Sequence, residues 1–448
     1  MDGLLQLAAE RASAYLETLK ERRVSPGPQQ IAQLAELGGE LPGAPSDDAK
    51  GTLELLDRVG SPATVASAGP RYFGFVTGGS LPVTVAANML AGAWDQNAFS
   101  PVASPVAAEL ERVALGWLIE ILGLPPQSYG ALVTGTQQAN FCGLAAARHA
   151  VLARSGWNVE EEGLIGAPPV RVVAGREAHS TLLRAVSYVG LGRGRVELVD
   201  VDDQGRMLPD ALPKLDDHTI LCIQAGNVNT GAFDPAAELC HAAREAGAWV
   251  HVDGAFGLWA RAAPGRAALA AGVELADSWA VDAHKWLNTP YDTGIVLVRD
   301  AEQLKAAMSL SAAYIPDAPR AAMDFTPEGS RRSRGVAVWA ALRTLGRSGV
   351  ADLIERCCVL ARRMADRLQE DGWDVLNDVV LNQVLVSFGD DDATRRVIRD
   401  VQDDGTCWCG GTEWQGRAAM RISVSCWATT EADIDSSAAA ITSAAARD

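Results

Sequence analysis

The sequence of 448 residues has no uninterrupted apolar run of about 18 residues, the length that a membrane-spanning helix requires. Its N-terminus also lacks the basic start and apolar core of a signal peptide. Basic residues are in deficit, with 39 Lys and Arg against 56 Asp and Glu and a formal net charge of −17. Such a charge repels phosphate backbones and anionic lipids, so we expect no nucleic-acid partner and no membrane association.

Cysteine occurs eight times but never as a Cys-x-x-Cys pair, and no histidine-rich segment accompanies it. Structural zinc sites need such groupings, so no metal site is expected. Scattered, unpaired cysteines are typical of the reducing cytoplasm, which is the predicted location. The eight are Cys142, Cys222, Cys240, Cys357, Cys358, Cys407, Cys409 and Cys426.

The organisation of the chain changes twice. Residues 1–95 form an N-terminal arm with two helical stretches and a Pro/Gly-rich segment, too little for a core of its own. Over 96–305, short β-rich runs such as VRVVAG, ILCIQAG and AWVHVDGA alternate with helical stretches, which predicts a large α/β domain with a mainly parallel sheet. Residues 306–448 predict a smaller C-terminal α+β domain. The arm needs a surface to cover, which favours an oligomer.

Two charged residues stand at the ends of strand-like runs. Asp253 ends the apolar run that begins at Ala248, and Lys285 follows the next run in the motif Asp-Ala-His-Lys. A lysine at a buried strand end is costly unless it is neutral or covalently used, and burial favours the nucleophilic free amine. The carboxyl ends of parallel strands are where α/β sheets bind ligands. Taken singly, Asp253 also fits a helix N-cap and Lys285 a surface position.

Two further motifs belong to the same pattern. Gly135 and Thr136 lie where a strand-like run turns into a helix, and such a turn offers backbone amides and hydroxyls to a phosphate. The turn lacks the lysine of a P-loop and the glycine spacing of a dinucleotide fingerprint. His179 follows another apolar run. A phosphate turn, an acidic strand end and a lysine strand end in one α/β domain predict a cofactor site.

The order of these motifs resembles the group II pyridoxal-phosphate-dependent decarboxylases, which include the aromatic-amino-acid, glutamate and diaminobutyrate enzymes. The resemblance runs from about Pro70 to the C-terminus. It implies the pyridoxal-phosphate fold type I, similar to aspartate aminotransferase, a homodimer, and decarboxylation of an L-amino acid. The residues that it places on pyridoxal 5'-phosphate are Gly135 and Thr136 at the phosphate, His179 and Ala255 on the ring faces, Asp253 at the ring nitrogen, and His284 beside Lys285, which holds the cofactor as a Schiff base.

The same resemblance implies a substrate pocket and shows two departures. Tyr72 and Phe73 match pocket positions, and Phe99 matches a residue that reaches across a dimer interface. In the first departure, Asn227 replaces a cofactor-facing threonine, and its amide can hydrogen-bond the ring oxygen. In the second, the mobile loop carries Phe325 where the decarboxylases have a tyrosine that protonates Cα. The nearest tyrosine, Tyr314, lies upstream.

The reaction outcome stays open at this point. Phenylalanine at that loop position occurs in aldehyde-forming relatives, so oxidative deamination, carbon–carbon cleavage and transamination are alternatives on the same scaffold. Arg417 and Arg421 are candidates for a substrate carboxylate or for structural ion pairs, and Trp408 and Trp414 for apolar pocket walls or core. A non-catalytic binding protein is the alternative of another class. It is disfavoured because Asp253, His284 and Lys285 are all retained.

Overall fold

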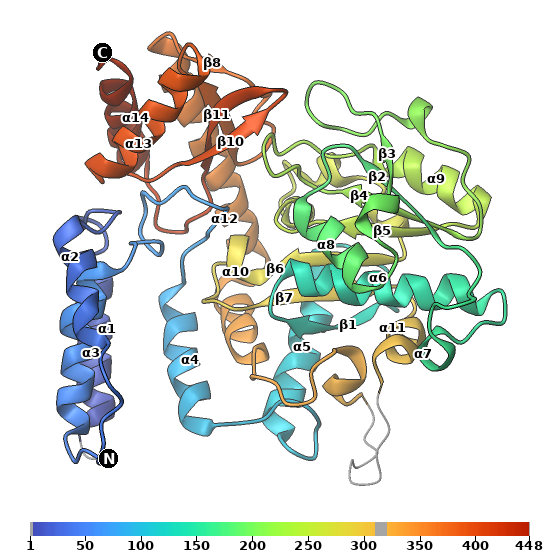
Figure 1. The fold of residues 1–448 in the computed structure, drawn as a ribbon, viewed down its shortest axis with the longest axis horizontal. Helices are drawn as coiled ribbons and strands as arrows, with labels where there is room; N and C mark the ends of the chain where they lie inside the picture. The colour runs from blue at the N-terminus through green and yellow to red at the C-terminus, as the bar shows by residue number, and fades with distance from the viewer. Residues whose placement is uncertain (1–2, 310–319, 448) are drawn as a thin grey trace. The chain divides into compact units, whose positions relative to one another are not determined.

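The computed structural model describes residues 3–309 and 320–447, which divide into two compact units (Figure 1). The smaller unit comprises Met1–Thr77, Leu360–Leu376 and Val384–Asp448, and the larger unit comprises Gly78–Val359 and Asn377–Gln383. The domain boundaries predicted at residues 95 and 305 remain predictions. None of the helices in the described residues is long and apolar enough to span a membrane.

The larger unit is built on a seven-stranded sheet with the order β1-β7-β6-β5-β4-β2-β3. Strand β7 is antiparallel to both of its neighbours and the other pairings are parallel, so the prediction of a mainly parallel α/β sheet is confirmed. The strands are β1 (Tyr129–Val133), β2 (Arg171–Gly175), β3 (Glu197–Val199), β4 (Thr219–Gln224), β5 (Trp249–Asp253), β6 (Ser278–Asp282) and β7 (Gly294–Val298).

Helices cover this sheet in the pattern of an α/β domain. Helix α6 (Thr136–Ala153) is rich in buried small residues and packs against β5, β6 and β7 (Figure 1). The remaining helices of this unit are α4 (Pro82–Trp94), α5 (Pro105–Ile121), α7 (Val159–Glu162), α8 (Ser180–Tyr188), α9 (Ala236–Ala246), α10 (Ala283–Trp286) and α11 (Ala301–Met308), with 3-10 turns at Arg193–Arg195, Pro209–Ala211, Gly257–Ala262, Ala267–Ala270, Val273–Leu275 and Ala322–Phe325.

A buried ion pair holds the strand that leads to the predicted phosphate turn. The guanidinium of Arg331 binds both carboxylate oxygens of Glu111, at 2.7 and 3.1 Å. Glu111 in turn accepts the backbone N–H of Leu132 in β1 at 3.1 Å. Through these contacts the pair ties α5 and β1 together. Removing either partner would leave a buried charge uncompensated.

The smaller unit contains a four-stranded sheet with the order β10-β11-β9-β8. Its strands are β8 (Asp374–Val375), β9 (Gln383–Ser387), β10 (Gly410–Trp414) and β11 (Arg417–Ser423), with Gln383 itself assigned to the larger unit. Its helices are α1 (Leu4–Thr18), α2 (Pro28–Gln33), α3 (Ala49–Ala63), α13 (Asp391–Asp404) and α14 (Glu431–Ala445), with a 3-10 turn at Leu34–Leu37.

Helix α12 (Gly335–Glu370) begins in the larger unit and ends in the smaller one. It consists of two helical segments joined across a break at Gly346, whose φ of 59° is left-handed. Glycine takes this conformation without the steric cost that a Cβ would add.

Candidate active site

The predicted strand ends meet at a cavity of about 240 Å³ in the larger unit. Parallel β1, β4, β5 and β6 present their carboxyl ends at one edge of the sheet, which is where such sheets bind ligands. The lining residues are Gly135, Thr136, Gln137, His179, Thr181, Gln224, Gly226, Val228, Asp253, Ala255, Phe256, Asp282, His284 and Lys285.

The turn between β1 and α6 has the features of an anion site. Thr136 is the first residue of α6, and its hydroxyl is buried with no hydrogen-bond partner among the described residues. Its backbone N–H donates to Asp282 Oδ1 at 2.6 Å. A Cβ at Gly294 would collide with the backbone of Gly135, so this turn requires glycine at the start of β7. An unused hydroxyl at a helix N-terminus suits a phosphate group.

Asp253 ends β5 with its side chain on the cavity wall and is 5% exposed. Asn140 Nδ2 donates to its Oδ2 at 3.1 Å, and the backbone N–H of Ala255 donates to its Oδ1 at 3.3 Å. The ion pairs within residues 3–309 and 320–447 include none to Asp253. A buried carboxylate with neutral donors and no cation suits a cationic ligand atom.

Lys285 lies in the short helix α10, directly after β6. Its Nζ is 3.1 Å from Asp282 Oδ2, and its side chain is 20% exposed, so the amine is held at the wall yet open to the cavity. His284 Nδ1 accepts the backbone N–H of Thr293 at 3.0 Å. Burial lowers the pKa of His284, so its ring is the neutral form with hydrogen on Nε2, directed toward Asp282.

His179 precedes α8 and caps it. Its Nδ1 lies 2.7 Å from the Thr181 hydroxyl and accepts the Thr181 backbone N–H at 3.3 Å. The capping contacts fix the orientation of the ring at the cavity wall.

Several predicted residues are not among those that line the cavity, and the larger unit contains three that the structure describes. Asn227 Oδ1 accepts the backbone N–H groups of residues 229 and 230, so this amide braces its own turn while Gly226 and Val228 face the cavity. Phe325 is buried in the core, with its ring edge on Tyr129 at 5.0 Å. Phe99 is half-buried, and its carbonyl accepts the N–H of Met323.

Three further predicted pocket residues belong to the smaller unit. Tyr72 stacks on Trp408 with ring centroids 5.1 Å apart, and Phe73 is buried and paired through its backbone with Trp408 and Ser423. Arg421 lies in β11, where burial lowers its pKa. Tyr314 lies outside the described residues.

Asp282 is the main lining residue that the sequence analysis did not single out. Its carboxylate contacts Thr136, His284 and Lys285 and so joins the phosphate turn to the lysine. The signal was present, because Asp282 stands at a strand end as Asp253 does. Asn140 and Gln224 carried no comparable signal, since an amide in a helix or strand has many structural uses.

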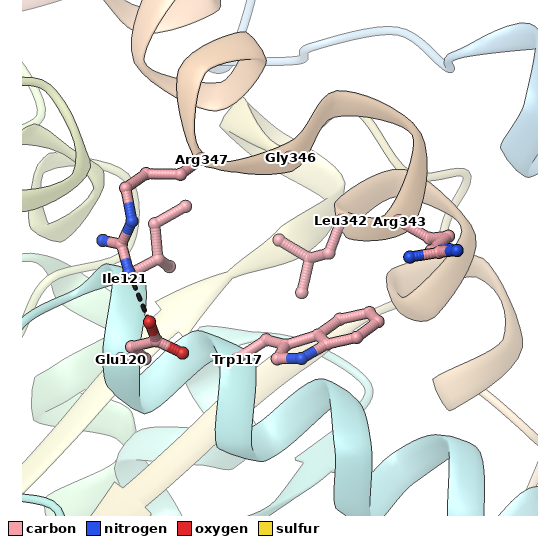
Figure 2. Close-up of a pocket in the computed structure, with 7 residues that line it drawn as sticks. All are labelled: Trp117, Glu120, Ile121, Leu342, Arg343, Gly346 and Arg347. Carbon is pink, nitrogen blue, oxygen red and sulfur yellow. Dashed lines mark hydrogen bonds and ion pairs between the residues drawn. The ribbon is translucent and has the colours of Figure 1, made fainter.

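A second cavity, of about 270 Å³, lies between α5 and α12 (Figure 2). Trp117, Leu342 and Ile121 form its apolar wall, and Arg347 is paired with Glu120 at 2.6 Å. The residues that line it include no lysine, histidine or hydroxyl. The groups needed for covalent or proton-transfer chemistry gather at the sheet edge instead.

Comparison with known proteins agrees with this geometry. Residues 56–389 match the family described as "Pyridoxal-dependent decarboxylase conserved domain". The chain belongs to this family. This decarboxylase is 26% identical to the aromatic-L-amino-acid decarboxylase of Bacillus atrophaeus, over 81% of this chain and 78% of that one. It is 27% identical to the acidic amino acid decarboxylase GADL1 of Mus musculus, over 78% of this chain and 65% of that one.

A crystal structure of Oryza sativa TDC with PLP and tryptamine has the same fold as this decarboxylase. The TM-score is 0.89 at 24% identity, over 98% of this chain and 96% of that one. The predicted fold class, family, pyridoxal-phosphate cofactor and amino-acid decarboxylation are therefore confirmed. The decarboxylase also fits its cofactor locally. In the part of the chain that the structure describes, the Thr136 hydroxyl has no hydrogen-bond partner and Asp253 has no cation, and both face one cavity with the Lys285 amine.

Proposed function

We propose that Lys285 is the amine that binds pyridoxal phosphate covalently and that Asp253 pairs with the ring nitrogen. The observation that carries this proposal is that both side chains line one small cavity from adjacent strand ends. When bound, the cofactor draws off the electrons left at Cα as the substrate carboxylate departs. The buried carboxylate of Asp253 stabilises a protonated ring nitrogen, which a neutral side chain does not.

The remaining cavity residues supply binding and orientation. The turn of Gly135 and Thr136 offers a free hydroxyl and helix amides to the phosphate. His179 and Ala255, both on the cavity wall, are proposed to enclose the ring between them. Asp282 holds the Lys285 amine at the cavity wall, and the neutral His284 ring lies against the same carboxylate.

The assignment of Lys285 is tested by Lys285→Ala and borohydride treatment of the holoenzyme. Reduction should fix the cofactor to the peptide that contains residue 285 in the wild type and to no peptide in the variant, with turnover abolished. A reduced cofactor on another lysine would contradict the assignment. Lys305, on α11 and outside the cavity, provides a matched control substitution to alanine.

We propose an aromatic L-amino acid as the substrate, with an acidic one as the alternative. The names of the two relatives support these two classes. Purified holoenzyme should be incubated with a panel of L-amino acids, and CO₂, amine, ammonia and aldehyde should be measured separately. Equal amounts of CO₂ and amine are expected from the preferred substrate. Ammonia with aldehyde would instead support the aldehyde-forming alternative.

A homodimer is proposed from the surface of helix α4. This helix has no charged residue and a single buried side chain, Thr84, while Val83, Met89, Leu90 and Trp94 are exposed. Exposed apolar patches of this kind mark interaction sites. Sedimentation should give twice the 47.2 kDa mass of the chain, and Leu90→Glu should shift the protein toward monomer. A fully active monomer would contradict the homodimer and the contribution of Phe99 to a neighbouring site that the family resemblance implies.

A cytoplasmic location is proposed from the state of the thiols. None of the eight cysteines, all within the described residues, forms a disulfide, and all are buried; reduced thiols of this kind are typical of the cytoplasm. Fractionation of the cells that make the protein tests this directly.

A further inference from the structure

Behind Asp253, away from the cavity, buried polar side chains are joined in a row by hydrogen bonds, called the hydrogen-bond chain below. Trp249 Nε1 donates to Ser278 Oγ at 2.9 Å, and Ser278 Oγ lies 2.8 Å from His251 Nδ1. His251 Nε2 lies 2.9 Å from Asn140 Oδ1, and Asn140 Nδ2 donates to Asp253. The side chains of Ser278, His251 and Asn140 are fully buried, so water does not supply alternative partners.

The strand period explains how these groups come together. Trp249, His251 and Asp253 alternate along β5 and therefore point to the same face of the sheet, the face that α6 covers. Ser278 begins β6 directly opposite His251 in the strand register. Asn140 reaches the same point from the second turn of α6. Strands β5 and β6 and helix α6 therefore supply every residue of the hydrogen-bond chain.

The two ends of the hydrogen-bond chain fix the direction in which its groups donate. An indole N–H only donates, and a carboxylate only accepts. Because Asn140 turns its Nδ2 to Asp253, its oxygen faces His251 and requires hydrogen on Nε2. The bare Nδ1 then accepts the Ser278 hydroxyl, whose oxygen accepts from Trp249. Every donor has an acceptor in this direction, and the reverse direction leaves Asp253 and Trp249 mismatched.

Burial keeps the histidine neutral, as the chain requires. It lowers the pKa of His251 to about 3, and desolvation is the cause. A neutral imidazole passes hydrogen bonding from one side to the other, because one nitrogen accepts while the other donates. Aligned hydrogen bonds of this kind polarise one another in a low-dielectric interior.

We propose that this chain, which runs from the indole of Trp249 to the carboxylate of Asp253, positions Asp253 and fixes His251 with hydrogen on Nε2. His251 and Asn140 are thus positioning residues that act on the cofactor ring through Asp253. The positioning role rests on the proposed pairing of Asp253 with the ring, whereas the direction of the chain does not.

Gly143 gives a way to disturb the chain without removing any of its polar groups. A Cβ at Gly143 would lie 2.6 Å from His251 Cε1 and 2.8 Å from Nδ1, so Gly143→Ala must displace the imidazole. Gly116 in α5 is a matched control, because a Cβ there meets nothing within 4 Å. Both are helical glycines, so propensity alone favours alanine at either position.

The direction of the chain is tested by ¹⁵N NMR of histidine-labelled holoenzyme. The His251 ring should show a pyrrole-type Nε2 and a pyridine-type Nδ1. Its signal is assigned by its loss in His251→Phe or, if that variant does not fold, by its displacement in Ser278→Ala. Hydrogen on Nδ1, or on both nitrogens, would overturn the proposed direction.

The positioning role is tested with ¹⁵N-labelled cofactor. In Gly143→Ala and Asn140→Leu the ring-nitrogen signal should move toward its unprotonated position, and cofactor affinity should fall roughly tenfold, the cost of one hydrogen bond to a charged group. Gly116→Ala should change neither. If Asp253→Asn leaves the ring signal unchanged, the proposed function of Asp253 fails. If Asp253→Asn moves it while Gly143→Ala and Asn140→Leu do not, only the positioning role fails.

Discussion

Asp253 and Asp282 end adjacent parallel strands, β5 and β6, and both are nearly inaccessible, at 5% and 2% exposed. Asp253 is held by an amide and a backbone N–H, with no cation among the described residues. Asp282 contacts the Lys285 amine at 3.1 Å and the Thr136 N–H at 2.6 Å. The same residue type at the same topological position thus has two different uses. The Asp253 carboxylate is left to pair with a cationic ligand atom, whereas the Asp282 carboxylate is already paired with the Lys285 amine.

The largest expected effect follows from removing the carboxylate that lacks a cation. Asp253→Asn should lower kcat/KM by on the order of a hundredfold or more, because a preorganised charge opposite a charged group is lost. Steady-state kinetics at saturating cofactor measure this change. A variant with near wild-type activity would show that Asp253 is not the ring partner, and the contrast with Asp282 would disappear.

Asp282→Asn should change the affinity for the cofactor phosphate more than it changes kcat. The substitution removes a negative charge beside the phosphate turn, while the asparagine oxygen can still accept the Thr136 N–H. Cofactor-free protein should therefore bind inorganic phosphate more tightly, by roughly tenfold, because one repulsive charge is removed from the cavity wall. Isothermal titration calorimetry measures this affinity. Weaker phosphate binding would mean that Asp282 organises the turn rather than competing with the phosphate.

The neutral form of His251, which supports Asp253 through Asn140, should affect how the free energy of unfolding depends on pH. The folded-state pKa of His251, about 3, lies below the ordinary histidine value, so the folded protein binds fewer protons than the unfolded chain between these values. Its contribution is complete above pH ~6.5 and is lost as the pH falls toward 3, with a slope of up to about 1.4 kcal/mol per pH unit.

Denaturant unfolding between pH ~5 and ~6.5 measures this slope in the wild type and in His251→Phe. The variant should lose the histidine contribution to the slope, whatever its absolute stability. His241→Phe, at an exposed position of α9, should keep it. Equal slopes in all three proteins would mean that His251 binds a proton in the folded state.

The smallest effect is expected at Phe325. The ring is buried against Tyr129, so Phe325→Tyr adds a hydroxyl to an apolar site and should cost about 1 kcal/mol of unfolding free energy. The ratio of amine to aldehyde should stay unchanged, because Phe325 does not line the cavity. A shift of that ratio toward amine would show that the substrate complex brings this residue to Cα, as the resemblance to aldehyde-forming relatives implies.

The sequence is most informative where strands end. Apolar runs mark β1, β2, β4, β5 and β6, and the polar residues just after them meet at one edge because the strands are parallel. Asp253, His179 and Lys285 are predictable for this reason. The position of Asn227 off the cavity was not predictable, because the two backbone N–H groups that donate to its oxygen depend on the turn that it makes. Burial of Phe325 depends on Tyr129, which is far away in sequence.

The supporting residues lie beyond sequence reasoning for a related reason. Asn140 and Gly143 are ordinary helix residues until the path of α6 over β5 is known. The contact of Gly143 with His251 joins two segments that no local pattern connects. Tertiary proximity, rather than residue type, gives both positions their use.

Helix α6 joins the proposed phosphate turn to the support of Asp253 through Thr136 and Asn140, which are one helical turn apart. This spacing makes the length of the segment as constrained as its residues. A single inserted residue between them would rotate Asn140 by about 100° around the helix axis and turn its amide away from Asp253. Over evolutionary time, this stretch should therefore tolerate exchanges on its outer face far better than insertions or deletions. An alignment of homologues should show it without gaps.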